Sequence, residues 1–130
     1  MKQSISTIES VLHRIVEDGI KAAKQSYSKP EQEEKLKGSI DGFNSCVGIN
    51  IGKDSIVVWF QNHLQEANKL AQEKFGKEDS DYWYWRCRAA EIEWTCNVLS
   101  AVFQAQGWPI IVAPTARGFI KAADIIGVSK

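Results

Sequence analysis

The segment from about Ser80 to Gln106 places the strongest constraint on the fold, because its apolar residues occupy two sides of a helix instead of one. Their spacing predicts a continuous helix that ends at Gly107. A helix with two apolar flanks must pack against neighbours on both sides, so we expect it at the centre of a helical bundle. The two flanks consist of Trp83, Cys87, Ala90, Trp94, Val98, Ala101 and Ala105, and of Trp85, Ala89, Ile92, Cys96, Leu99 and Phe103.

Two polar stripes separate these flanks. The stripe that we expect to face solvent consists of Arg86, Glu93, Asn97, Ser100 and Gln104. The stripe that packing of both flanks would enclose consists of Tyr84, Arg88, Glu91, Thr95 and Gln106. Burial of Arg and Glu side chains is costly unless they are paired and hydrogen-bonded. The enclosed stripe therefore needs a structural or functional explanation.

Two interpretations of the enclosed stripe remain open at this point. In the first, Arg88 and Glu91 form an i,i+3 ion pair that holds neighbouring helices or a subunit interface together. In the second, Arg88, Glu91 and Thr95 form the polar floor of a ligand-binding pocket, with Trp94 and Tyr84 at its rim.

A second candidate site follows the segment WPIIVA, where Thr115 precedes a predicted helix. Free backbone N–H groups at a helix start attract anions. Thr115 adds a hydroxyl group, Arg117 adds a donor suited to phosphate or carboxylate, and Gly118 permits close approach. Together with the Arg and Trp residues of segment 80–106, this predicts an anionic ligand with an aromatic ring, such as a nucleotide.

Helical spacing also predicts helices over residues 6–26, 29–46 and 55–75, and a short C-terminal helix over 116–126. Capping boxes are expected at Ser6–Glu9 and Ser28–Glu31, and Asp54 is expected to cap the third helix. Gly38 and Gly42 lie on one face and suggest a packing notch. The apolar stripe of segment 55–75 consists of Ile56, Phe60, Leu64, Ala67, Ala71 and Phe75, and Gly76 is placed to end that helix in the left-handed conformation.

The predicted fold is mainly α: a single domain over residues 1–130, with four long helices around the central Trp-rich helix and a short C-terminal helix. The sequence predicts a strand over residues 108–113, which would form one small β pair with residues 46–51 or with the same segment of a second subunit. Residues 45–52 are ambiguous, because they could extend the second helix to Gly48 or form that strand. The strand and the long amphipathic helices favour a homo-oligomer, a dimer or higher.

The overall charge is balanced, with 16 basic and 16 acidic residues, so nucleic acid is not an expected partner. No stretch approaches the roughly 18 apolar residues of a membrane span, and the start lacks the apolar core of a signal peptide. We therefore expect a cytoplasmic protein without membrane contact. Three cysteines without a CxxC motif, Cys46, Cys87 and Cys96, predict core thiols, with no disulfide and no thiolate metal site.

The two histidines, His13 and His63, lie on different helices, and no hydrolase or phosphate-loop motif occurs, so catalysis, a cofactor or a metal is not expected. The leading hypothesis is a small non-catalytic binding protein that sequesters or senses an anionic, nucleotide-like ligand, of a type frequent on phages and mobile elements. The alternative is a protein–protein inhibitor or adaptor whose exposed surface includes Tyr82, Trp83 and Trp85. An enzyme of unrecognised type is the third hypothesis.

Overall fold

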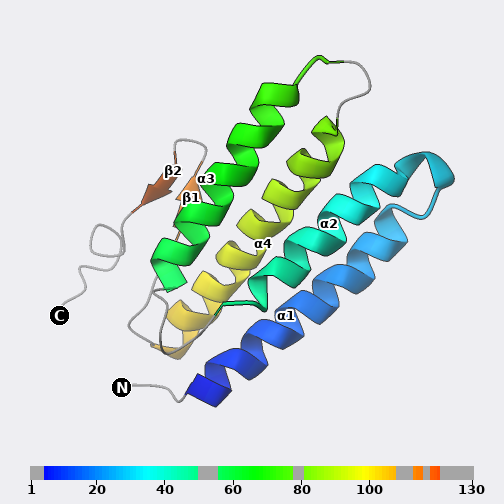
Figure 1. Cartoon of the computed structure of the whole chain (residues 1–130). Coiled ribbons are helices and arrows are strands. Elements are labelled where there is room, and N and C mark those ends of the chain that lie inside the picture. Colours follow the sequence, from blue (N-terminus) through cyan, green and yellow to red (C-terminus); the bar gives the residue numbers. More distant parts are fainter. Residues whose placement is uncertain (1–4, 50–55, 78–80, 108–112, 116–117, 121–130) are drawn as a thin grey trace.

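The computed structural model describes residues 5–49, 56–77, 81–107, 113–115 and 118–120. Its fold is mainly helical, as predicted (Figure 1). The elements in chain order are α1 (Ile5–Ser26), the short 3-10 helix η1 (Pro30–Gln32), α2 (Glu33–Cys46), α3 (Ile56–Lys74), α4 (Tyr82–Gln106), β1 (Ala113–Thr115) and β2 (Gly118–Ile120).

The helix α4 contacts α1, α2 and α3, and its contacts with α2 and α3 are the most extensive in the bundle. The four helices lie side by side in the order α1, α2, α4, α3 (Figure 1). Their shared core contains fully buried residues from each helix, among them Leu12, Phe43, Phe60, Ile92 and Phe103. The flank of α4 that contains Ile92, Cys96, Leu99 and Phe103 is buried against these neighbours. The prediction that both flanks pack is wrong, because Trp83, Trp94, Ala101 and Ala105 of the other flank are exposed.

The glycines of α2 allow the closest helix contact in the bundle. The Gly38 Cα lies against the backbone of Tyr84, and a Cβ atom at Gly42 would stand 2.7 Å from the Arg88 carbonyl oxygen. From the first pair to the second, the residue number increases by four on both helices, so α2 and α4 run parallel. The predicted packing notch of Gly38 and Gly42 is confirmed, and it brings the backbone of α2 directly onto the polar stripe of α4.

Several helix ends differ from the predicted ones. The helix α1 begins at Ile5, so Ser6 lies inside it and not at its cap. The capping box expected at Ser28–Glu31 is wrong, because the helix begins one residue later and the Lys29 backbone N–H donates to Gln32 Oε1 at 3.2 Å. Gly76 adopts the left-handed conformation after α3, as predicted, and α4 ends at Gly107, as predicted, where the backbone is also left-handed. Asp54, the expected cap of α3, lies outside the described residues.

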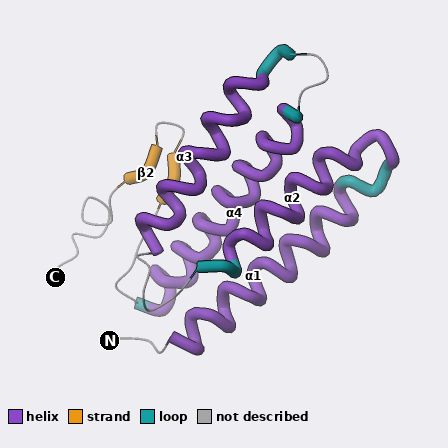
Figure 2. The backbone as a smooth tube through the Cα atoms, in the orientation of Figure 1, coloured by secondary structure: helices purple, strands orange, loops and turns teal. Residues whose placement is uncertain are grey.

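The C-terminal region differs most from expectation. The helix predicted over 116–126 is wrong where the chain is described, because Gly118–Ile120 forms β2 and pairs antiparallel with β1, with Thr115 opposite Gly118. Of the segments 46–51 and 108–113, which the sequence predicts to pair, the described residues show α2 extending to Cys46, a turn at 47–48, and Ala113 paired with Ile120, whereas residues 50–51 and 108–112 lie outside the described part of the chain. The small hairpin contacts α3 and α4 instead (Figure 2).

Candidate functional site

The predicted enclosed stripe of α4 faces α2, and its first members form a chain of hydrogen bonds across the two helices. The Tyr84 hydroxyl donates to Asp41 Oδ2 at 2.6 Å, and it accepts a hydrogen bond from an Arg88 guanidinium nitrogen at 2.8 Å. The Arg88 guanidinium also lies over the Trp85 ring, 5.1 Å from its centroid. Arg88 is thus held by Tyr84 and Trp85 and, through the Tyr84 hydroxyl, is linked to the Asp41 carboxylate.

The ion pair expected between Arg88 and Glu91 does not form, because the Arg88 side chain turns along α4 toward Tyr84. Glu91 is half-buried and has no cation bound to it, so its burial raises the pKa of the carboxyl group above its usual value. The nearby Ser39 hydroxyl opposes that rise in pKa. Ser39 is fully buried on α2, and its Oγ atom makes no hydrogen bond to any described residue.

The remaining members of the predicted pocket do not converge on an open space. Thr95 is fully buried, and its hydroxyl donates to the Glu91 carbonyl oxygen of its own helix at 2.8 Å. Trp94 is 41% exposed and meets the buried Phe43 ring edge-on, with 5.6 Å between the centroids. Thr95 therefore acts as a packed core residue in this structure, whereas Trp94 keeps part of its ring at the surface.

The three cysteines are free and buried, as predicted. Burial raises the pKa of the Cys46 and Cys96 thiols to about 12, far from any value that would make a nucleophile at neutral pH. Burial also raises the pKa of Cys87, whose thiol lies 3.9 Å from the hydroxyl of Tyr27, the residue that follows α1. These thiols are core groups and offer no reactive site.

A hollow of about 590 Å³ opens beside Tyr84, between the first turns of α2 and α4. Its lining contains three carboxylates and one ammonium group, contributed by Glu33, Glu34, Asp81 and Lys37. Asp81 binds Lys74 at 2.9 Å and accepts from Trp85 Nε1 at 3.0 Å, and the hydrogen bond from Lys74 holds the pKa of its carboxyl below the usual range. We call this site the acidic hollow; its charge is the opposite of what an anionic ligand requires.

Three aromatic rings form a row at the surface where α3 ends and α4 begins. Phe75 is 70% exposed, Trp83 is 48% exposed, and Tyr82 lies between them. The ring centroids of Phe75 and Tyr82 are 5.4 Å apart, and those of Tyr82 and Trp83 are 5.0 Å apart, with both pairs edge-to-face. We call Phe75, Tyr82 and Trp83 the aromatic surface; it is the largest group of exposed rings in the described part of the chain.

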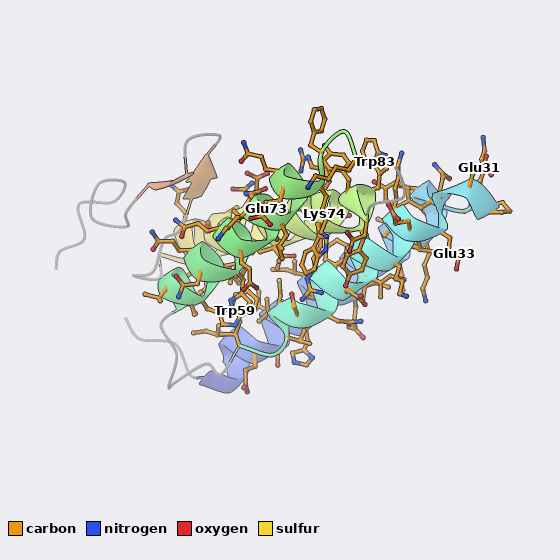
Figure 3. All side chains as sticks on the ribbon, turned by 45° about the horizontal axis from the view of Figure 1, so that its top comes forward. Glu31, Glu33, Trp59, Glu73, Lys74 and Trp83 are labelled. Atoms are coloured by element: carbon orange, nitrogen blue, oxygen red, sulfur yellow. The ribbon has the colours of Figure 1, made fainter. Side chains whose placement is uncertain are left out.

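Two cations lie against the aromatic surface. The Lys35 ammonium group of α2 sits over the Trp83 ring, 4.3 Å from its centroid. Arg86 lines a groove of about 230 Å³ together with Phe75 and Tyr82, and it forms no ion pair with a described residue. The Trp83 and Lys74 side chains are visible near the end of this surface in Figure 3. Cationic groups on aromatic rings make this surface both apolar and positively charged.

The predicted site residues therefore divide between several places. Tyr82 and Trp83 lie in the aromatic surface, whereas Trp85 is half-buried and packs against the core. Tyr84, Arg88 and Glu91 face α2. Thr115 and Gly118 lie opposite each other in the β hairpin, far from a helix start, and Arg117 lies outside the described residues.

Phe75 lies at the surface, although its spacing predicts a place in the apolar stripe. Its spacing continues the apolar stripe of segment 55–75, but α3 ends at Lys74 and Phe75 begins the turn toward Gly76. A residue that leaves the helix leaves the stripe as well, so its ring turns to the surface. The left-handed Gly76 was the signal that could have identified this change of direction.

No family model, no curated protein and no solved structure matches this chain. Within the described ranges, no three His, Cys, Asp or Glu side chains gather in a way that could hold a metal ion. None of the described helices combines the length and apolar character that a bilayer crossing requires.

Proposed function

We propose that this chain is a non-catalytic protein-binding module, an adaptor or an inhibitor, that contacts its partner through the aromatic surface. The observation that carries the proposal is the exposure of Phe75, at 70%, next to Trp83, at 48%. Large apolar rings that remain in water mark places where another molecule covers them. In this proposal the Trp-rich α4 is the central scaffold that holds two of the three rings.

The composition of the aromatic surface supports a protein partner. Tyr, Trp and Arg residues supply most of the binding energy in protein interfaces, and they act in clusters. Tyr82, Trp83 and Arg86 bring these three residue types together within two turns of α4. The rings are held by edge-to-face contacts within the free protein, so little ordering is required when a partner binds.

The anionic-ligand hypothesis has weaker support and stays a prediction. Arg88, its main cation, already donates to Tyr84 and stacks on Trp85. The hollow beside Tyr84 carries more carboxylates than ammonium groups. A nucleotide phosphate would therefore meet repulsion at the open side of this site. The enzyme hypothesis likewise stays a prediction, since no described cluster supplies a nucleophile or a general base.

Site-specific photo-crosslinking tests the proposal in a lysate of the source cell. A photoreactive phenylalanine analogue replaces Phe75 or Trp83 in two separate variants, and a third variant carries it at Val58. Val58 is the matched control, because it is 49% exposed and lies on α3 away from the aromatic surface. We expect one discrete partner band from positions 75 and 83 that is absent from position 58. Equal crosslinking at all three positions, or none at any, would contradict the proposal.

A thermal-shift screen with nucleotides distinguishes the small-molecule alternative. Under the proposal, no nucleotide changes the Tm of the wild-type chain. A nucleotide that raises the Tm of the wild type and of Phe75→Ala, but leaves that of Arg88→Lys unchanged, would favour the anionic-ligand hypothesis instead.

A further inference from the structure

We infer that the aromatic surface of one chain binds the acidic hollow of a second copy, so that the protein assembles head to tail. The two sites are different surfaces of the same molecule. The aromatic surface carries cations and projecting rings, and the acidic hollow carries carboxylates around a concave space. The inference goes beyond the proposed function, because it concerns the chain alone and needs no partner protein.

The two sites lie on opposite faces of the helix layer, at the same end of the bundle. On α2, Lys35 reaches the Trp83 ring, whereas Glu33 and Glu34 line the acidic hollow. Residues two apart on a helix point in nearly opposite directions, so Glu33 cannot share the face of Lys35. Figure 3 shows Trp83 above the ribbons and Glu33 below them. One molecule can therefore use both sites at once.

Charge complementarity identifies the second copy as the occupant. The two charged residues that the structure places against the aromatic surface, Lys35 and Arg86, are both cations. In the acidic hollow, Asp81 is already paired with Lys74, which leaves the carboxylates of Glu33 and Glu34 against one ammonium group, and neither glutamate forms an ion pair with a described residue. Arg86 of one copy can pair with a carboxylate of this hollow in the next copy.

The shapes of the two sites agree with this pairing. The aromatic surface projects exposed rings, and the acidic hollow is a concave space of about 590 Å³ with the Tyr84 ring in its lining. An indole ring inserted there would bury its apolar area and leave its N–H group free to donate to Glu33 or Glu34. Because the contact joins two different surfaces, it is heterologous and repeats from copy to copy.

Sedimentation velocity on the purified chain tests the inference. We expect the average mass to rise with concentration above the 14.6 kDa of one chain. The association should weaken as the salt concentration increases from about 0.01 M to about 1 M, because exposed charges are screened. If the chain remains monomeric up to about 1 mM at low salt, the Kd of self-association exceeds that concentration, and the inference is overturned.

Two charge-reversal variants identify the surfaces. One carries Glu33→Lys and Glu34→Lys in the acidic hollow, and the other carries Lys35→Glu and Arg86→Glu at the aromatic surface. Each variant alone should be monomeric, because one of its two sites is disabled. Their equimolar mixture should associate, since the intact aromatic surface of the first variant meets the intact hollow of the second, and the two reversed surfaces are again opposite in charge. This restored complex also shows that both variants are folded.

Other results would overturn the head-to-tail arrangement. If the hollow variant still assembles while the aromatic-surface variant does not, two aromatic surfaces meet each other in a symmetric dimer. If the mixture stays monomeric although both variants have wild-type helical circular dichroism, the two surfaces do not bind one another. The crosslinking test remains distinguishable although it uses the same surface, because a band from a second copy contains only this chain, whereas a band from a partner contains another protein.

Discussion

Glu91, at the contact between α2 and α4, is a half-buried carboxyl group that forms no ion pair with a described residue. The pKa of Glu91 is raised because burial disfavours the ionised form. The folded protein therefore holds this proton more strongly than the unfolded chain does. As the pH increases from the unfolded pKa through the folded one, Glu91 lowers the free energy of unfolding, and at higher pH that loss is complete.

Glu91→Gln should consequently stabilise the protein at neutral pH. Glutamine keeps the size of the side chain and cannot ionise, so it avoids the burial of a negative charge, and we expect a gain on the order of 1 kcal/mol because the site is only half-buried. The gain should shrink as the pH falls toward 4.5, the usual pKa of the group. Urea unfolding of both proteins across this pH range measures the difference. A gain that is independent of pH would show that Glu91 is not the titrating group.

The Tyr84 hydroxyl is the second residue-scale test, because it joins Asp41 to Arg88. Tyr84→Phe removes both hydrogen bonds and should lower the free energy of unfolding by about 1–2 kcal/mol, since one bond ends on a carboxylate and the other on a guanidinium group. Tyr82→Phe is the matched control on the same helix. Its hydroxyl has no partner among the described residues, so its change should stay below about 0.5 kcal/mol. Equal losses in the two variants would contradict the assigned role.

At this scale, the sequence identified the important residues of the stripe but not their partners. The spacing places Arg88 next to both Tyr84 and Glu91, and nothing local decides between them. The decision comes from Asp41, which is 43 positions from Tyr84 in the chain and is brought close only by the glycines of α2. Side-chain pairing across helices depends on tertiary contacts that periodicity cannot reveal.

At the scale of whole elements, the contact of α2 with α4 depends on the absence of two side chains. Gly38→Ala places a Cβ atom inside the backbone of Tyr84, and a carbonyl group in a helix cannot move without shifting the whole element. We expect a net loss of at least about 2 kcal/mol, even though alanine favours a helix by about 1 kcal/mol over glycine. Chemical denaturation of the purified variant measures this loss.

Gly19→Ala provides the comparison for that experiment. The nearest atoms to a Cβ atom at Gly19 belong to the Phe43 ring, a side chain that can shift without moving a helix backbone. Its cost should therefore be clearly smaller than that of Gly38→Ala. If the two variants lose the same stability, the tight contact of the α2 backbone with α4 is not what stabilises this pair of helices.

Long and short elements differ in how well the sequence predicts them. The four long helices follow from apolar spacing over many residues, and such a signal survives small errors at the ends. The C-terminal helix rested on one capping residue, Thr115, and on a glycine at its end. Pairing of Thr115 with Gly118 in a hairpin overrides that weak signal. Short elements depend on their pairing partners, and β2, the partner of β1, begins three positions after the end of β1.

The molecule as a whole protects its three thiols. Cys46, Cys87 and Cys96 are buried on two different helices, and with a pKa of about 12 roughly one in ten thousand Cys46 or Cys96 thiols is ionised at pH 8. We expect a thiol reagent to label all three only when the bundle unfolds. The labelling rate should then fall with increasing stability across the variants above. A thiol that reacts as fast as in a short peptide would show that its helix opens separately.

The parallel arrangement of α2 and α4 has a consequence for the speed of folding. Contacts of the bundle connect distant parts of the chain, as the 43 positions between Asp41 and Tyr84 and the 60 between Tyr27 and Cys87 illustrate. A simple up-and-down bundle forms most contacts between consecutive helices. Here α4 lies between α2 and α3, so α2 packs mainly against α4 and not against the next helix in the chain. Closing so long a loop costs entropy before any contact is gained. This chain should therefore reach its native state more slowly than helical proteins of its length usually do.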